Sequence, residues 1–263
     1  MPLAHAVSPL HLAFAAIAAF LAGAINSVAG GGTLITFPTL IALGLPPVTA
    51  NATNTVAIWP GALGSLWGFR REFAATERRM NWMILPSIIG GAAGAMLLRI
   101  TPPGLFEKMV PFLILFATLV FTARTPIQRL VRSSRPGAHQ TSRWLLSAMA
   151  FQIFVGLYGG YFGAGMSIMM LSVLSILGMT DLLKMNALTS LFSLCINGVA
   201  ALLFIMAKMI FWPYVLVMAC ASILGGWGAA GVARKIGGDR VRQFVIFVGF
   251  AISAMLFYRF FHR

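Results

Sequence analysis

Two glycine clusters are the residues whose type and spacing best suit binding chemistry in this chain. Gly30–Gly32 is followed by Thr33, and Gly163-Ala164-Gly165 is followed by Met166 and Ser167. A helix that begins after such a cluster presents unpaired backbone N–H groups and the positive end of its dipole. Glycine lets these amides approach a ligand without a Cβ in the way. The chemistry expected of both clusters is therefore the binding of an anion.

Neutral polar side chains accompany both clusters and could add hydrogen-bond donors. A second polar group begins each following span, and N-capping is an equally open role for it. The predicted anion-binding residues are Asn26, Ser27, Gly30, Gly31, Gly32, Thr33, Asn51, Thr53, Asn54, Thr55, Tyr158, Gly159, Gly160, Gly163, Gly165, Ser167, Asn186, Thr189 and Ser190.

The acidic residues argue against a cation transporter. Glu72, Glu77, Glu107, Asp181 and Asp239 all fall in expected loops or at span ends, whereas proton and sodium relays place carboxylates inside spans. No metal-ligand cluster, nucleotide-binding motif or catalytic constellation can be read from the sequence. We therefore expect no enzyme activity, no metal and no cofactor.

Composition decides which elements must position these residues. Of the 263 residues, 59% are hydrophobic and only 9% are charged, whereas soluble domains carry about 25% charge. The mean hydropathy is +0.90. This composition excludes a soluble enzyme and predicts an all-α polytopic protein embedded in a lipid bilayer. The net charge of +14 is attributed to membrane orientation and not to nucleic acid, which we do not expect as a partner.

Ten apolar segments are expected, and they form two similar sets of five. They lie at 10–30, 33–44, 51–69, 82–99 and 105–123, and at 144–163, 166–178, 186–207, 211–233 and 243–261. A helix needs about 20 apolar residues to cross a bilayer, so 33–44 and 166–178 are predicted to be re-entrant pieces or halves of broken helices. Glycine pairs such as Gly90-Gly91 and Gly225-Gly226 are expected to serve close helix packing.

An internal repeat relates the two sets. The segment GAINSVAGGG at Gly23–Gly32 is similar to GLYGGYFGAG at Gly156–Gly165, and NATNT at Asn51–Thr55 is similar to NALTS at Asn186–Ser190. The predicted organisation is a first repeat over 1–123, a basic connector over 124–143 and a second repeat over 144–263. Each repeat has a broken or re-entrant helical pair followed by three transmembrane helices, which gives 8–10 membrane segments.

Basic residues predict how the repeats are oriented. Loops 70–79, 124–143 and 234–242 hold 13 of the 19 Lys and Arg residues, and the positive-inside rule places them in the cytoplasm. The most basic loop within the first repeat is 70–79 and within the second it is 234–242, and these loops have different places in their repeats. This difference favours inverted repeats over a parallel arrangement with four spans per half. Inverted repeats with broken helices are a recurrent architecture of secondary transporters.

The segment Gly23–Glu72 carries a family resemblance. Its glycine triplet, the stretch PPVTANATNT and the closing PGALGSLWGFRRE resemble the signature region of the sulfite exporter TauE/SafE family. In the second copy the Asn-Ser pair becomes Gly159-Gly160. The resemblance extends over nearly the whole chain. It implies a bacterial inner-membrane permease for a small sulfur oxyanion or a sulfonate.

The favoured function is a secondary transporter, acting as an exporter, with the anion held between two half-helix starts near the membrane midplane. Two alternatives remain open at this point. One is an anion channel with the same dipole-lined path, and the other is a membrane accessory protein without transport. Small-residue faces also make the sequence compatible with a homodimer.

Overall fold

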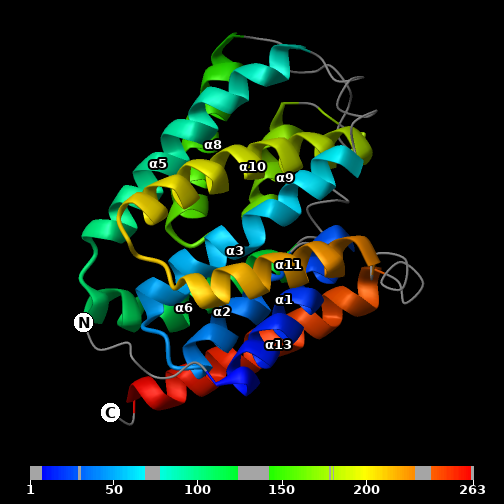
Figure 1. Ribbon diagram of the computed structural model, residues 1–263. Coiled ribbons are helices and arrows are strands. Elements are labelled where there is room, and N and C mark those ends of the chain that lie inside the picture. Colours follow the sequence, from blue (N-terminus) through cyan, green and yellow to red (C-terminus); the bar gives the residue numbers. More distant parts are fainter. Residues whose placement is uncertain are drawn as a thin grey trace.

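The computed structural model describes residues 8–28, 31–68, 78–123, 142–177, 179, 181–228 and 238–261, and within these residues it is all-helical (Figure 1). The first half contains α1 (Pro9–Val28), α2 (Thr33–Ala42), α3 (Pro47–Gly68), the 3-10 helix η1 (Arg78–Met83), α5 (Ile84–Ile100) and α6 (Pro103–Thr122). The second half contains α8 (Ser142–Tyr161), α9 (Met166–Ile176), α10 (Leu182–Met206), α11 (Trp212–Gly228) and α13 (Gly238–Phe261).

Each predicted break is present as a short helix after a long one. Helix α2 has 10 residues and begins at Thr33, and α9 has 11 residues and begins at Met166. At 1.5 Å per residue, neither helix is long enough to cross a bilayer by itself. The sequence expectation of two half-length segments is confirmed by these bounds.

Helices α3 and α10 begin earlier than the polar segments Asn51–Thr55 and Asn186–Ser190. Pro47 opens α3, at a position where proline lacks only an amide that would be unpaired anyway. Asp181 caps α10, and its Oδ1 accepts from the amides of Leu183 at 3.0 Å and Lys184 at 3.3 Å. Asn51 and Asn186 therefore lie inside helices, so N-capping is not their role.

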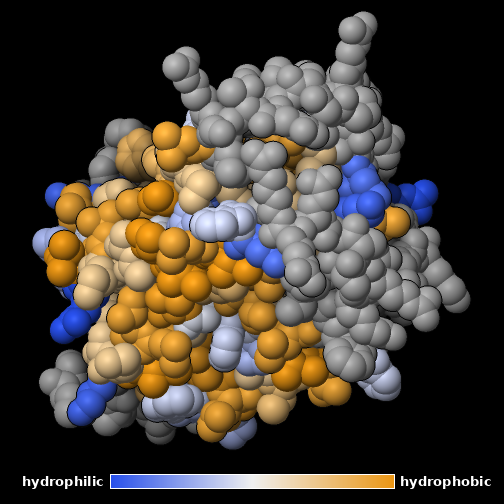
Figure 2. All heavy atoms as spheres, turned by 90° about the horizontal axis from the view of Figure 1, so that it is seen from above, coloured by the Kyte–Doolittle hydropathy of each residue, from blue (hydrophilic) through white to orange (hydrophobic). Residues whose placement is uncertain are grey.

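Four of the described helices are long and apolar enough to cross a membrane, over Pro9–Asn26, Met80–Ile100, Pro103–Thr122 and Leu183–Met206. Large apolar side chains are exposed on the outside of the helices, among them Ile100 at 75% and Trp227 at 86%. Figure 2 shows such side chains gathered over a broad face of the molecule. A surface of this kind suits contact with lipid chains and would be costly in water.

Glycines on α8 and α1 bring each of these helices close to a helix of the other half, α5 and α11 respectively. A Cβ on Gly156 of α8 would meet Ser87 and Gly91 of α5, and a Cβ on Gly23 of α1 would meet Ser222 and Gly226 of α11. These contacts place helix backbones side by side, which confirms the packing role expected of the glycine pairs. Each of these two contacts joins a helix of the first half to a helix of the second half.

Chain direction differs between equivalent helices. In Figure 1 the colour sequence shows α5 and α8 running together toward one side of the molecule, while α1 and α11 run toward the other side. Helices α3 and α10, which occupy equivalent places in the two halves, also run in opposite senses. They meet where the indole Nε1 of Trp59 donates to the carbonyl of Leu194 at 3.1 Å.

Candidate anion site at the helix breaks

The two breaks lie close together because both rest on one turn of α6. A Cβ on Gly31 would lie 2.5 Å from the ring of Phe121, and a Cβ on Gly165 would lie 3.4 Å from the carbonyl of Ala117. Ala117 and Phe121 are four residues apart and are neighbours on one helix face. The rings of Phe37 in α2 and Phe162 in the second break also make an edge-to-face contact at 5.1 Å.

The second break, at 162–165, is a tight reversal of the chain. The amide of Gly163 donates to the carbonyl of Tyr158 at 3.0 Å, and Gly163 has φ +79°. Gly165 has φ +80° and precedes the first residue of α9. Residues with side chains rarely adopt such φ values, so the two glycines fit the conformation that ends α8 and starts α9.

Several backbone amides at this second break have no hydrogen-bond partner on the described backbone. Among the described carbonyls, none accepts from the amides of Ala164, Gly165 or Ser167. Ala164 and Gly165 are buried, and an unpaired buried amide costs free energy. Consecutive amides near left-handed residues form concavities that bind anions. The start of α9 therefore has the donors that an anion requires.

The carbonyl groups of the second break are covered by side chains. The hydroxyl of Tyr158 donates to the carbonyl of Ala164 at 2.7 Å. The Nδ2 group of Asn51, from α3 of the other half, donates to the carbonyl of Tyr161 at 2.8 Å. These two carbonyl oxygens accept hydrogen bonds and therefore repel an anion less, while the amide N–H groups of the break stay available. Both effects favour an anion site.

Three buried side-chain oxygens on the polar segments have no hydrogen-bond partner among the described residues. They are Oδ1 of Asn51, Oδ1 of Asn54 and Oγ1 of Thr189. These residues are exposed by 0%, 1% and 6%. Asn54 and Thr189 occupy equivalent positions in α3 and α10. Such atoms mark places where a bound molecule can complete the hydrogen bonding.

The first break is arranged differently. Asn26 Oδ1 accepts from the amide of Gly32 at 2.8 Å, so a side chain of the same half already uses this donor. Thr33 is buried at the first position of α2. Gly30 and the side chain of Ser27 lie outside the described residues. The described part of this break thus has fewer available amides than the second one.

Several other predicted site residues make contacts that serve the fold. Thr53 Oγ1 accepts from the amide of Phe211 at 3.0 Å, in the turn between α10 and α11. Thr55 Oγ1 donates to the carbonyl of Asn51 at 3.0 Å. A Cβ on Gly160 would meet the backbone of Gly91.

The remaining predicted residues lie on α8 and α10. Gly159 approaches Met166 and Ile196 so closely that a Cβ would lie 2.7 Å from the sulfur of Met166. Asn186 and Ser190 are half-buried on α10. Asn197, which the sequence suggested for interhelical bonding, has its Oδ1 4.0 Å from a Cβ built on Gly163. Asn186, Ser190 and Asn197 are spaced to share one face of α10 with Thr189.

Charge around the breaks favours an anion. Among the described side chains, the carboxylates of Glu107 and Asp181 are exposed and lie at the beginnings of α6 and α10. The described residues contain no group of three or more His, Cys, Asp or Glu side chains that could hold a metal ion. Neither of these two carboxylates lies within the second break, at 162–165.

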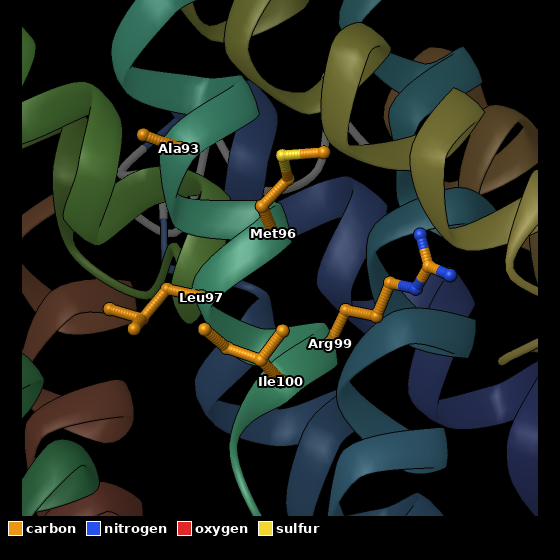
Figure 3. A pocket seen from close by; sticks show the side chains of 5 residues that line it. All are labelled: Ala93, Met96, Leu97, Arg99 and Ile100. Atoms are coloured by element: carbon orange, nitrogen blue, oxygen red, sulfur yellow. The ribbon is translucent and has the colours of Figure 1, made fainter.

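A separate hollow of about 440 Å³ lies on the outside of α5. Figure 3 shows its lining, which comes from Ala93, Met96, Leu97, Arg99 and Ile100. None of these residues belongs to either break, and most of the lining is apolar. We therefore do not assign the anion site to this hollow.

The fold and the breaks define a multi-pass helical membrane protein, and comparison with known proteins defines its family. The sequence model described as Sulfite exporter TauE/SafE matches residues 15–256, so the chain belongs to this family. The resemblance seen in the sequence is thereby confirmed.

Curated relatives agree with this family. The chain is 32% identical over 240 residues to a "Probable membrane transporter protein" of Haemophilus influenzae, covering 91% of each chain. It is 28% identical over 259 residues to the "Probable membrane transporter protein YfcA" of Escherichia coli strain K12, covering 96% of this chain and 91% of the relative. No solved structure matches the chain. The protein is a membrane transporter and not an enzyme.

Proposed function

We propose that this transporter carries small anions containing oxidised sulfur, such as sulfite or organosulfonates, out of the cytoplasm across a bacterial inner membrane. The observation that carries the anion assignment is the group of amides at Ala164, Gly165 and Ser167, none of which is bonded to a described backbone carbonyl. The sulfur chemistry follows the description of the family as sulfite exporters.

The site is proposed to hold the anion with neutral donors only. Helix α9 points its positive end at the second break, and the amides there can each donate to an oxyanion oxygen. A salt bridge to arginine would bind more tightly through two charge-assisted hydrogen bonds. Neutral donors suit a carrier, because cargo that binds reversibly is released readily on the far side.

Alternating access is proposed to follow from inverted repeats. The exchanged contacts of Gly23 and Gly156, together with the opposite chain directions of α3 and α10 in Figure 1, support this relation between the halves. Rocking one repeat against the other would open the breaks to each side in turn. In this proposal the basic loops 70–79, 124–143 and 234–242 face the cytoplasm, and the breaks lie near the membrane midplane.

Flux into vesicles tests the proposal. The purified protein is reconstituted in proteoliposomes, and uptake of ³⁵S-labelled sulfite and isethionate (2-hydroxyethanesulfonate) is followed against concentration. We expect slow, saturable flux that each anion inhibits for the other. Large voltage-driven currents without saturation would instead indicate a channel. Absence of both flux and ligand-dependent thermal stabilisation with every sulfur anion tried would overturn the proposal.

A further inference from the structure

The second break offers hydrogen-bond acceptors as well as donors, which restricts the chemistry of the ligand it can hold. This inference rests on the proposed function, since it concerns the anion that the amides of Ala164, Gly165 and Ser167 would bind. The acceptors are Oδ1 of Asn51 and Oδ1 of Asn54, neither of which has a partner among the described residues.

The orientation of the Asn51 amide is fixed by its partner. The carbonyl of Tyr161 can only accept a hydrogen bond, so the group 2.8 Å from it must be the Nδ2 donor of Asn51. The oxygen of this amide is consequently turned away from Tyr161, and it stays unpaired in a side chain that is 0% exposed. The side chain reaches the second break through its nitrogen and leaves an acceptor beside that break.

Asn54 adds a second acceptor on the same side of α3. Residues three apart share a helix face, so Asn54 lies one turn further along α3 than Asn51, whose amide contacts the Tyr161 carbonyl. Its side chain is 1% exposed, and its oxygen has no partner. An anion with only acceptor oxygens would satisfy the amides of α9 and would leave both of these oxygens unpaired.

We propose that the transported ligand is a monoanion that carries its own hydrogen-bond donor. Its negative oxygens face the amides at the start of α9, and its hydroxyl or protonated oxygen donates to Oδ1 of Asn54. Hydroxysulfonates and hydrogen sulfite belong to this class. Simple alkanesulfonates and sulfate do not, because they lack the donor.

Two sulfonates of matched size separate this inference from the proposed function. Isethionate carries a hydroxyl where propane-1-sulfonate carries a methyl group, and both keep the sulfonate. Binding of each is measured as inhibition of labelled isethionate flux in proteoliposomes and as thermal stabilisation of the full chain in detergent. Sites built to bond a substrate hydroxyl reject the analogue without it by large factors, so we expect at least about a 100-fold preference for isethionate.

The variant Asn54→Leu should reduce this preference to less than about fivefold, because it replaces the unpaired oxygen with a methyl group of similar size. Its oxygen has no hydrogen-bond partner to lose among the described residues, so the fold should survive. Ser222→Ala is the matched control, because it also removes a buried polar group but lies on α11 against Ala57 and Ala219. It should keep the full preference.

Equal binding of the two sulfonates by the unaltered protein would overturn this inference while leaving sulfonate transport intact. That result would mean that water, and not the ligand, completes the bonding of the asparagine oxygens. Binding of neither sulfonate would overturn the proposed substrate class as well. A preference that survives in Asn54→Leu would also contradict the assignment of the donor partner.

Discussion

The two helix breaks have the same place in their repeats but divide their hydrogen bonds differently. In the first break, Asn26 uses a side-chain oxygen to bind the amide of Gly32. In the second break, Tyr158 and Asn51 bind the carbonyls of Ala164 and Tyr161. Side chains thus bond one backbone donor at the first break and two backbone acceptors at the second.

This difference favours the second break as the place where the proposed anion would bind. Covering a carbonyl leaves the positive end of α9 exposed to a ligand, whereas covering an amide weakens the positive end of α2. Repetition in the sequence would suggest two equal half-sites. In our proposal the second break supplies most of the binding, because its covered carbonyls leave the amides of α9 available, and the first break has a more structural part.

The largest expected effect on transport comes from the asparagines that the repeat places in equivalent positions. Asn51→Leu removes the only cover of the Tyr161 carbonyl seen among the described residues, and losing such a buried bond costs about 1–3 kcal/mol. The uncovered carbonyl would also oppose an anion at the second break, so we expect flux per inserted molecule at low substrate concentration to fall by about 10- to 100-fold, where each tenfold corresponds to about 1.4 kcal/mol of lost binding. Asn186→Leu, on a half-buried residue, should change flux by less than about threefold. Equal losses in initial-rate measurements would show that the breaks contribute equally.

Replacing Gly31 of the first break or Gly165 of the second break by alanine should destabilise the protein to different extents, because both glycines have positive φ. At Gly31, with φ +88°, a Cβ would also lie 2.5 Å from the ring of Phe121. At Gly165 the nearest atom would be 3.4 Å away. Gly31→Ala should therefore cost about 2–5 kcal/mol, from strain and overpacking together, and Gly165→Ala about 1–2 kcal/mol from strain alone. Melting temperatures in detergent check the order, and a lower melting temperature for Gly165→Ala would contradict it.

Replacing the buried threonines Thr53 and Thr189 by valine should have different effects on the melting temperature in detergent. Thr53→Val removes the acceptor of the Phe211 amide and should destabilise the protein by about 1–3 kcal/mol. Thr189 Oγ1 has no partner among the described residues, so Thr189→Val should leave the melting temperature unchanged or raise it. A large loss for Thr189→Val would reveal a structural bond at this position.

The smallest effect is expected at the tyrosine of the second break. Tyr158→Phe removes one hydroxyl that donates to Ala164 and should cost about 1 kcal/mol. The carbonyl left uncovered opposes an anion at α9, so the apparent KM should rise by about two- to fivefold. Asn26→Leu should not raise the apparent KM, because it frees an amide at the first break. An increase in Asn26→Leu as large as that in Tyr158→Phe would remove the asymmetry.

Local signals made much of this fold predictable from sequence. The starts of α2 and α9 follow glycine clusters and short apolar runs, and both features act over a few residues. The close packing of Gly90 and Gly225 follows from the absence of a side chain. The predicted start of α3 at Asn51 is wrong, because the helix begins at Pro47 and the polar run Asn51–Thr55 lies inside it.

Which polar residues bind a neighbouring helix and which lie beside the candidate site could not be predicted from the sequence, because this depends on contacts between distant residues. Asn51 bonds to a residue 110 positions away, and Thr53 bonds to one 158 positions away. Both belong to one polar run, yet one supports the second break and the other supports the turn before α11. Only the packing of the two halves decides between these roles.

A structure of the protein soaked with hydrogen selenite tests the central claim most directly. This anion resembles hydrogen sulfite, and its selenium can be located by anomalous scattering. The account predicts a selenium peak at the second break, with its oxygens within hydrogen-bond distance of the amides of Ala164, Gly165 and Ser167. A peak confined to the first break or to the outer hollow on α5, with none at the start of α9, would contradict it.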